Sequence, residues 1–396
     1  MKNKITAGAF LVMIAAFIVM LLLPADKESI EEENRVMSTV PPISAETAFS
    51  GEFAEGFESF IGDNIGYRSF FTQLSKDMDG AKGFPLREGQ IVSTNKDIGT
   101  GTIQKQTLLV ADNAIMEMFI KNTEQEKRYA ETVNSYARKL PEGIKLFSML
   151  VPTKLEFCEP IYKNLQDSQK SAIESIYSML DSNVTAIDVY GVLEPYSDEY
   201  IYLRTDHHWT QLGAYYAYRE FMKMEGGSAV DKEDFEVNGI QSVLGSLSDR
   251  VSLSEVSAEP DIIEWYDVDT TDSVRVGMHD ISDGGKLTNY NGVMYERTKT
   301  DYNFFFGCDH PIVEMTNTDN SDGKTLVILK DSYSNALAPW LIKSYHKVIL
   351  VDPRIYKGKL DTILDEYSPD ELLIVNYIFT TNFPDYCSLL ENMYQN

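Results

Sequence analysis

Five uninterrupted apolar runs recur along this chain, each bounded by polar or turn residues. Such runs are typical of strands covered on both faces of a sheet, because a half-exposed strand alternates polar and apolar positions. They span residues 144–152 (IKLFSMLVP), 184–190, 325–330 (TLVILK), 347–352 and 371–376 (ELLIVN). Segments with helical spacing lie between them, at 124–139, 168–181, 210–223, 334–344 and 360–366. The alternation predicts an α/β fold with a parallel sheet flanked by helices.

The stretch from residue 226 to residue 320 breaks this alternation. It is rich in Asp, Ser, Thr and Gly, and its apolar runs are short, such as IIEWYDV and DYNFFFG. We expect an inserted region of loops and short antiparallel strands within the α/β domain.

The first 25 residues have a different pattern. Residues 5–24 carry no charge and follow Lys2 and Lys4, and a run of about 20 apolar residues matches the hydrocarbon core of a bilayer. No small-x-small cleavage site follows the run, which favours an uncleaved anchor over a cleaved signal peptide. With the two lysines in the cytoplasm, we expect a single-pass protein of the cell membrane whose remaining chain is extracytoplasmic.

Residues 26–95 predict a connecting region. A polar stretch ends near Pro41 and Pro42 and is typical of a stalk. Aromatic residues at helical spacing follow, beginning at Phe53 and Phe57, and predict short amphipathic helices. We therefore divide the chain into an anchor (1–25), a stalk and helical segment (26–95), and a catalytic domain (96–396) that contains the insertion.

The overall charge excludes one class of partner. The 396 residues include 35 Lys and Arg but 61 Asp and Glu, for a formal net charge of −26. Such a surface repels nucleic acid, so no nucleic acid partner is expected. The three cysteines, Cys158, Cys308 and Cys387, lack metal-site spacing and allow at most one disulfide. Their apolar neighbours favour ordinary buried thiols.

Polar residues follow three of the predicted strands, at the edge where α/β proteins collect their functional groups. Ser332 lies between the run 325–330 and the helix 334–344. A serine in such a turn exposes its hydroxyl beside backbone N–H groups that can hold an oxyanion, although a serine before a helix is more often an N-cap. Lys154 follows the run 144–152, and Asn376 is the last residue of the run 371–376.

The stretch TDHHWT contains two of the chain's five histidines. In an extended segment, residues i and i+2 project to the same side. Asp206 and His208 therefore share a face just before Thr210, a predicted N-cap, and His207 points away. An acid and an imidazole together suit the base of a serine nucleophile. A metal site of Asp206, His207 and His208 is the alternative; because adjacent histidines rarely face one ion, we favour serine chemistry without metal or cofactor.

Together, TDHHWT and LKDSYSN resemble the DHHW family of bacterial cell-surface proteins. They are also similar to alginate O-acetylation proteins of the SGNH-hydrolase-like superfamily. The resemblance implies an SGNH-hydrolase-like sheet with a circularly permuted motif order, because Asp206 and His208 precede Ser332. It implies that Asp206 orients the base His208 and that Ser332 is the nucleophile. Lys330 stands where SGNH enzymes have glycine.

The same resemblance implies an activity. A membrane-bound O-acyltransferase would supply acetyl groups, and this chain would move them onto hydroxyls of a cell-surface or secreted polysaccharide. Tyr333, Asn376, Lys154 and Trp209 are candidates for oxyanion or substrate contacts. Two alternatives are a carbohydrate esterase with the same triad, and a non-catalytic glycan-binding or export-complex scaffold.

Overall fold

The computed structural model describes residues 89–97, 103–241, 244–251, 260–269, 273–281 and 287–394, with a few single positions before residue 61. The predicted anchor lies outside these residues, as does most of the predicted stalk and helical segment. No helix within the described residues is long and apolar enough to cross a membrane. The chain divides into two compact units, and the site lies in the larger one, residues 87–94, 105–250 and 257–396.

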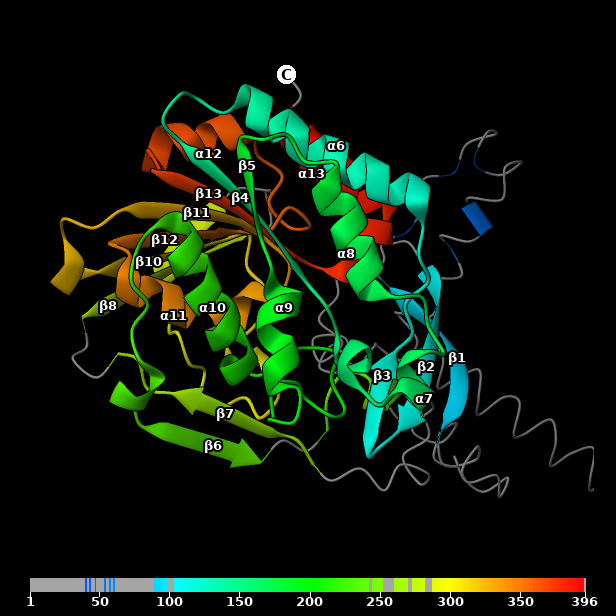
Figure 1. Cartoon of the computed structure of the whole chain (residues 1–396). Helices are drawn as coiled ribbons and strands as arrows, with labels where there is room; N and C mark the ends of the chain where they lie inside the picture. Colours follow the sequence, from blue (N-terminus) through cyan, green and yellow to red (C-terminus); the bar gives the residue numbers. More distant parts are fainter. Residues whose placement is uncertain are drawn as a thin grey trace, which may run out of the picture. The chain divides into compact units, whose positions relative to one another are not determined.

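An eight-stranded sheet forms the centre of the larger unit (Figure 1). Its strands, in spatial order, are β5 (Val184–Ile187), β4 (Lys145–Val151), β13 (Glu371–Tyr377), β11 (Thr325–Lys330), β12 (Lys347–Val351), β10 (Ile312–Asn317), β8 (Val274–Ile281) and β9 (Leu287–Asn291). The first five are parallel, and the last three are antiparallel to their neighbours. All five strands predicted from apolar runs are present.

The predicted parallel strands pair as expected, but the sheet as a whole is mixed. Strands β10, β8 and β9 come from the predicted insertion and extend one edge of the sheet. β10 has half-buried positions among its buried ones and β9 is exposed throughout, so neither shows the apolar run of a strand covered on both faces. Other strands of the chain form two smaller sheets: β1 (Gln90–Asp97), β2 (Ile103–Ala111) and β3 (Ala114–Glu117), and β6 (Val237–Gln241) with β7 (Ile262–Tyr266).

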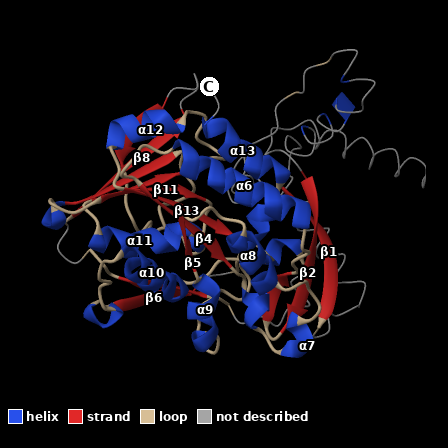
Figure 2. Ribbon diagram, turned by 45° about the horizontal axis from the view of Figure 1, so that its top comes forward, coloured by secondary structure: helices blue, strands red, loops and turns tan. Residues whose placement is uncertain are grey.

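Helices cover both faces of the parallel strands (Figure 2). One layer contains α6 (Thr123–Lys139), α8 (Gln169–Ser178), α12 (Leu360–Tyr367) and α13 (Pro384–Tyr394), and the other contains α9 (Val189–Leu193), α10 (Gln211–Glu225) and α11 (Ser334–Ser344). Short helices join them: α7 (Pro160–Lys163) and the 3-10 turns η1 (Lys154–Phe157), η2 (Glu194–Tyr196), η3 (Lys232–Asp234), η4 (Ser248–Arg250), η6 (Tyr302–Phe304), η7 (Thr318–Asn320) and η8 (Ile378–Asn382). The five helices predicted between residues 124 and 366 are confirmed to within a few residues at their ends, whereas the helices predicted from Phe53 onward lie mostly outside the described residues.

The helix ends explain how α10 and α11 begin beside the site. The Thr210 hydroxyl caps α10 by accepting the Gly213 N–H, as predicted, and Gly226 ends that helix with a positive φ of 93°. By contrast, no side chain caps the start of α11 at Tyr333. Ser332 therefore is not an N-cap, and its hydroxyl has another partner.

Candidate active site

Ser332 lies in the turn between β11 and α11, at the carboxyl edge of the sheet. The buried Asp331 carboxylate holds this turn against the end of β13. It accepts hydrogen bonds from the N–H groups of Tyr333 (3.1 Å) and Tyr377 (2.9 Å) and from the Thr380 hydroxyl (3.0 Å). Burial raises the pKa of Asp331, although nearby positive charge and these bonds oppose the shift. The turn is thus held without using the Ser332 side chain.

The structure joins Asp206, His208 and Ser332 in one chain of hydrogen bonds. His208 Nε2 lies 2.7 Å from Ser332 Oγ, and His208 Nδ1 lies 2.6 Å from Asp206 Oδ1. Asp206 and His208 are each 6% exposed, whereas Ser332 is half-buried. The acid and the base are therefore shielded from water, and the hydroxyl remains within reach of a substrate.

The loop that brings Asp206 to His208 differs from the expected extended segment. Residues 204–208 bend, and Asp206 Oδ1 accepts the backbone N–H of His208 at 2.9 Å, which is the short-range bond of an Asx turn. His207 does not point away: its ring centre lies 3.9 Å from that of His208, and its Nδ1 lies 3.2 Å from Ser246 Oγ. The side-chain pairing was predicted, but the backbone geometry that produces it was not.

Three donors surround the Asp206 carboxylate: the His208 N–H, the His208 Nδ1–H, and the Ser246 N–H at 2.9 Å. Burial by itself raises the pKa of Asp206, but the neighbouring imidazoles and these bonds outweigh it and hold the pKa well below its usual range. An ionised acid at Nδ1 places the proton there, as assigned from the hydrogen-bond network. The Nε2 lone pair then faces the Ser332 hydroxyl.

The insertion supplies supports for this loop that no sequence motif marks. The Asp261 carboxylate accepts the Thr205 N–H at 2.8 Å, across 56 residues of chain. Gly245 packs so closely that an added Cβ would lie 2.5 Å from Asp206 Cβ and 2.7 Å from the Thr205 backbone. Ser246, the next residue, donates its N–H to Asp206 across 40 residues. These contacts form only on folding, so local patterns could not have shown them.

Two aromatic residues hold the base against the nucleophile turn. The Tyr302 ring stacks on the His208 imidazole, with centroids 3.7 Å apart and an interplanar angle of 2°. Trp209 Nε1 donates to the Tyr333 carbonyl at 2.8 Å, and the Tyr302 hydroxyl donates to the same oxygen at 3.3 Å. Trp209 is fully buried. Its indole therefore holds the turn from behind, and a contact between Trp209 and substrate stays a prediction.

The predicted oxyanion donors are largely engaged elsewhere. Both amide hydrogens of Asn376 are used, one by Asp331 (3.3 Å) and one by the Tyr386 hydroxyl (2.7 Å). The Tyr333 N–H is donated to Asp331, and the Tyr333 hydroxyl donates to the His207 carbonyl. Within the described residues, the Ser332 N–H has no acceptor. This group is the donor that the geometry leaves free for an oxyanion.

Lys154 begins η1, just after β4. Burial lowers the pKa of its ammonium, and in the described part of the chain that group forms no hydrogen bond or ion pair. The structure thus does not connect Lys154 to the triad.

The alternative of a metal site is compatible with the positions of three side chains. Asp206, His207 and His208 offer ligand atoms that lie within 4.8 Å of one another, the one such group found among the described residues. These atoms already bond to one another or to Ser332 and Ser246. An ion could bind only by replacing those hydrogen bonds.

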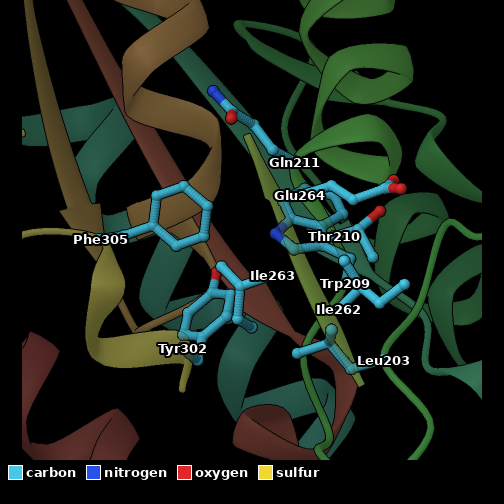
Figure 3. A pocket seen from close by; sticks show the side chains of 9 residues that line it. All are labelled: Leu203, Trp209, Thr210, Gln211, Ile262, Ile263, Glu264, Tyr302 and Phe305. Atoms are coloured by element: carbon cyan, nitrogen blue, oxygen red, sulfur yellow. The ribbon is translucent and has the colours of Figure 1, made fainter. Parts of the chain in front are cut away.

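Figure 3 shows a narrow, tightly lined recess beside the site. The rings of Tyr302 and Phe305 lie on one side of it, and residues of β7 and the start of α10 lie on the other. None of Asp206, His208 and Ser332 lines it. The recess therefore lies behind the positioning residues and is not the place where Ser332 would meet a substrate.

The fold and the site define an α/β protein with a Ser–His–Asp hydrogen-bond chain at the carboxyl edge of its parallel strands. The profile of the family described as DHHW protein matches residues 86–351. The chain therefore belongs to the DHHW family.

Solved structures agree with this assignment. A DHHW family protein from Eubacterium siraeum DSM 15702 is 24% identical, with a TM-score of 0.65 over 77% of this chain and 100% of that chain. Bacillus cereus PatB1 is 19% identical, with a TM-score of 0.60 over 71% and 99%. PatB1 with a sulfonyl adduct is 18% identical, with a TM-score of 0.59 over 71% and 97%. These likenesses show a shared fold.

The O-acetyltransferase domain of Pseudomonas putida AlgJ is more distant, at 14% identity and a TM-score of 0.41 over 71% of this chain and 96% of that chain. A likeness at this level supports no inference about this chain. No curated protein sequence matches the chain.

Proposed function

We propose that this protein is an extracytoplasmic O-acetyltransferase that acts through Ser332, His208 and Asp206. The observation that carries the proposal is the hydrogen-bond chain from Asp206 through His208 to the Ser332 hydroxyl, with distances of 2.6 and 2.7 Å. A serine hydroxyl is a weak nucleophile unless a base accepts its proton, and the base needs an acid to hold its tautomer. The nucleophile, its base and the acid that holds the base therefore meet at the carboxyl edge of the sheet.

The proposed reaction has two halves. In the first, His208 Nε2 takes the Ser332 proton as Oγ attacks an acetyl carbonyl; the donor leaves with that proton, and an acetyl ester remains on Ser332. In the second, His208 takes the proton of a sugar hydroxyl, whose oxygen attacks the ester, and Ser332 regains its proton. The Ser332 N–H stabilises the oxyanion in each half. Asp206 stabilises the imidazolium that forms twice.

Family membership and the resemblance to O-acetylation proteins support transfer to a polysaccharide hydroxyl. PatB1, which shares the fold, has been observed with a sulfonyl adduct; sulfonyl reagents attach to activated nucleophiles, and we expect Ser332 to react in the same way. The uncharged run at residues 5–24 supports an anchor. An anchor would keep the enzyme near a membrane-bound acyl donor and raise their effective concentration. Protease treatment of intact cells should therefore reach the chain after residue 25.

Labelling of Ser332 by a sulfonyl or fluorophosphonate reagent tests the triad. Losing the base of a triad lowers the rate by ~10⁴-fold or more. His208→Ala should therefore abolish labelling, as should Ser332→Ala. His207→Ala is the matched control: its ring lies beside His208 and its Nδ1 faces the Ser246 hydroxyl, so this variant should keep most of the wild-type rate. Equal loss in both histidine variants, with recovery on adding zinc or manganese, would support a metal site instead.

The acceptor distinguishes transfer from hydrolysis. Given a small activated acetyl ester and an oligosaccharide, the purified protein should acetylate the sugar faster than it releases acetate, as measured by mass spectrometry. A positioned hydroxyl can compete with water because effective molarities reach about 10⁵ M or more. Deacetylation of an acetylated glycan, without transfer to any tested sugar, would favour a carbohydrate esterase. An unreactive Ser332 in a protein that still binds glycan would favour a scaffold.

A further inference from the structure

A second nucleophile–histidine–acid arrangement lies outside the Ser332 site. Cys308 Sγ is 3.6 Å from His310 Nε2, and His310 Nδ1 is 2.9 Å from Asp280 Oδ1. Asp280 belongs to β8, and the other two residues lie in the loop before β10. His310 is 5% exposed, whereas Cys308 is half-buried and unpaired. The sulfur can thus meet a small reagent while its histidine partner stays shielded.

The surroundings of His310 favour its charged form. Nδ1 faces the Asp280 carboxylate, with the Tyr290 hydroxyl at 3.5 Å, and Nε2 faces the Phe306 carbonyl (3.0 Å) and the Cys308 sulfur. A neutral imidazole can donate from one nitrogen only. Burial lowers the pKa of His310, but the bonds to Cys308, Asp280 and the Phe306 carbonyl outweigh it and raise the pKa to about 9. A cation therefore lies next to the thiol at neutral pH.

The loop holds Cys308 in this position from both sides. Phe306 and Gly307 adopt positive φ angles of 66° and 81° and reverse the chain just before it. On the other side, the Asp309 carboxylate bonds Lys330 Nζ at 2.5 Å and an Arg354 guanidinium nitrogen at 2.6 Å. The close approach of sulfur and imidazole is therefore built into the fold rather than left to a free side chain.

We propose that Cys308, with His310 and Asp280, is a thiol-modification site that forms mixed disulfides with low-molecular-weight disulfides. The Cys308 thiolate attacks one sulfur of R–S–S–R, a Cys308–S–S–R bond forms, and R–S⁻ leaves. No other oxidant is needed, because the incoming disulfide is the species reduced. A cation beside a thiol favours the thiolate, which is the reactive form. The proposal does not depend on the activity of Ser332.

The chain contains its own controls. Cys158 is half-buried like Cys308, but burial raises the pKa of its thiol to about 11. Cys387 is fully buried, and burial raises the pKa of its thiol to about 12. Among the described residues, neither thiol has a histidine as a hydrogen-bond partner. A difference in reaction rate between Cys308 and Cys158 therefore reflects the effect of His310 more than a difference in solvent access.

The experiment treats the folded full-length protein with dithiobis-nitrobenzoate, an aromatic disulfide that releases a coloured thiolate, and locates the adducts by mass spectrometry. An ordinary thiol is only a few per cent thiolate at pH 7, so Cys308 should react ~10-fold or more faster than Cys158. His310→Gln should remove this advantage, and Asp280→Asn should reduce it. Cys308→Ser should remove the fast phase, whereas Cys158→Ser should leave it.

The pH dependence separates chemistry from access. In the wild type, His310 remains charged below its pKa of about 9, so Cys308 should react faster than Cys158 throughout the range from about pH 6 to pH 8. In His310→Gln the Cys308 rate should fall toward that of Cys158 throughout the same range. If His310→Gln does not fold, the proposal is still tested by Asp280→Asn, because the Asp280 side chain is 51% exposed. The wild-type pH profile tests it as well. A Cys308 rate equal to that of Cys158 across this pH range would overturn the proposal.

Discussion

Replacing Asp206 by Asn tests the acid of the triad with almost no change in shape. The carboxylate accepts three N–H groups: two from His208, at 2.9 Å and 2.6 Å, both on Oδ1, and one from Ser246, at 2.9 Å on Oδ2. A carboxylate accepts on both oxygens, but an amide accepts on one and donates on the other. Asn therefore fails on one side whichever way its amide is turned.

Each orientation of the amide has a different cost. If the oxygen faces His208, the NH₂ meets the Ser246 N–H, and an unsatisfied buried donor costs about 1–3 kcal/mol. If the NH₂ faces His208, Nδ1 must accept, so the proton moves to Nε2 and the base can no longer take the Ser332 proton. In both cases the charge that stabilises the imidazolium is gone. We expect the labelling rate of Ser332 to fall by ~10⁴-fold.

The assay is the rate of Ser332 labelling per folded molecule. Asp261→Asn is the control, because Asp261 holds the same loop through the Thr205 N–H but does not contact the imidazole. It should lower stability with a much smaller effect on labelling. Wild-type labelling by a folded Asp206→Asn protein would refute the role of this acid.

Stability should also depend on pH through Asp206. Its pKa is lower in the folded state than the usual value near 4, so the folded state favours the ionised form. The resulting stability is present above about pH 4 and is lost as the pH falls toward the folded-state pKa. The difference in unfolding free energy between wild type and Asp206→Asn, from urea titrations, should persist from neutral pH to about pH 4 and narrow below it. A difference that widens in acid would contradict this.

Two further substitutions test the supports of the site. Trp209→Phe removes the 2.8 Å bond to the Tyr333 carbonyl and part of a buried ring; urea unfolding should show a loss of about 1–3 kcal/mol, and an unchanged midpoint would contradict the positioning role. Lys330→Met removes a cation that is 1% exposed and lies 2.5 Å from Asp309 and 3.4 Å from Asp352. Because one partner of a buried ion pair is removed, we expect a loss of about 3–5 kcal/mol, and a loss below about 1 kcal/mol would show that Arg354 alone compensates.

The parallel half of the fold could be predicted from local pattern because two-sided burial imposes a continuous apolar run. The predicted strand 325–330 and helix 334–344 coincide with β11 and α11. The same reasoning missed β10 as part of the central sheet, because its half-buried positions interrupt the run. An edge formed by antiparallel strands depends on which distant segment pairs with it, and residue periodicity does not carry that information.

The candidate site also combines features that the sequence shows with features that only the fold produces. The sequence alone determined which residue types were available: a serine at a strand-to-helix turn, and an acid two residues before a histidine. Only the tertiary structure placed His208 beside Ser332, across 124 residues, and bent the Asp206 loop. It also engaged Asn376 with Asp331 and brought Asp280 to His310. Each of these outcomes depends on which hydrogen-bond partner a buried polar group meets when distant segments pack. Because such a group has several possible partners, the local sequence does not show which one it will bind.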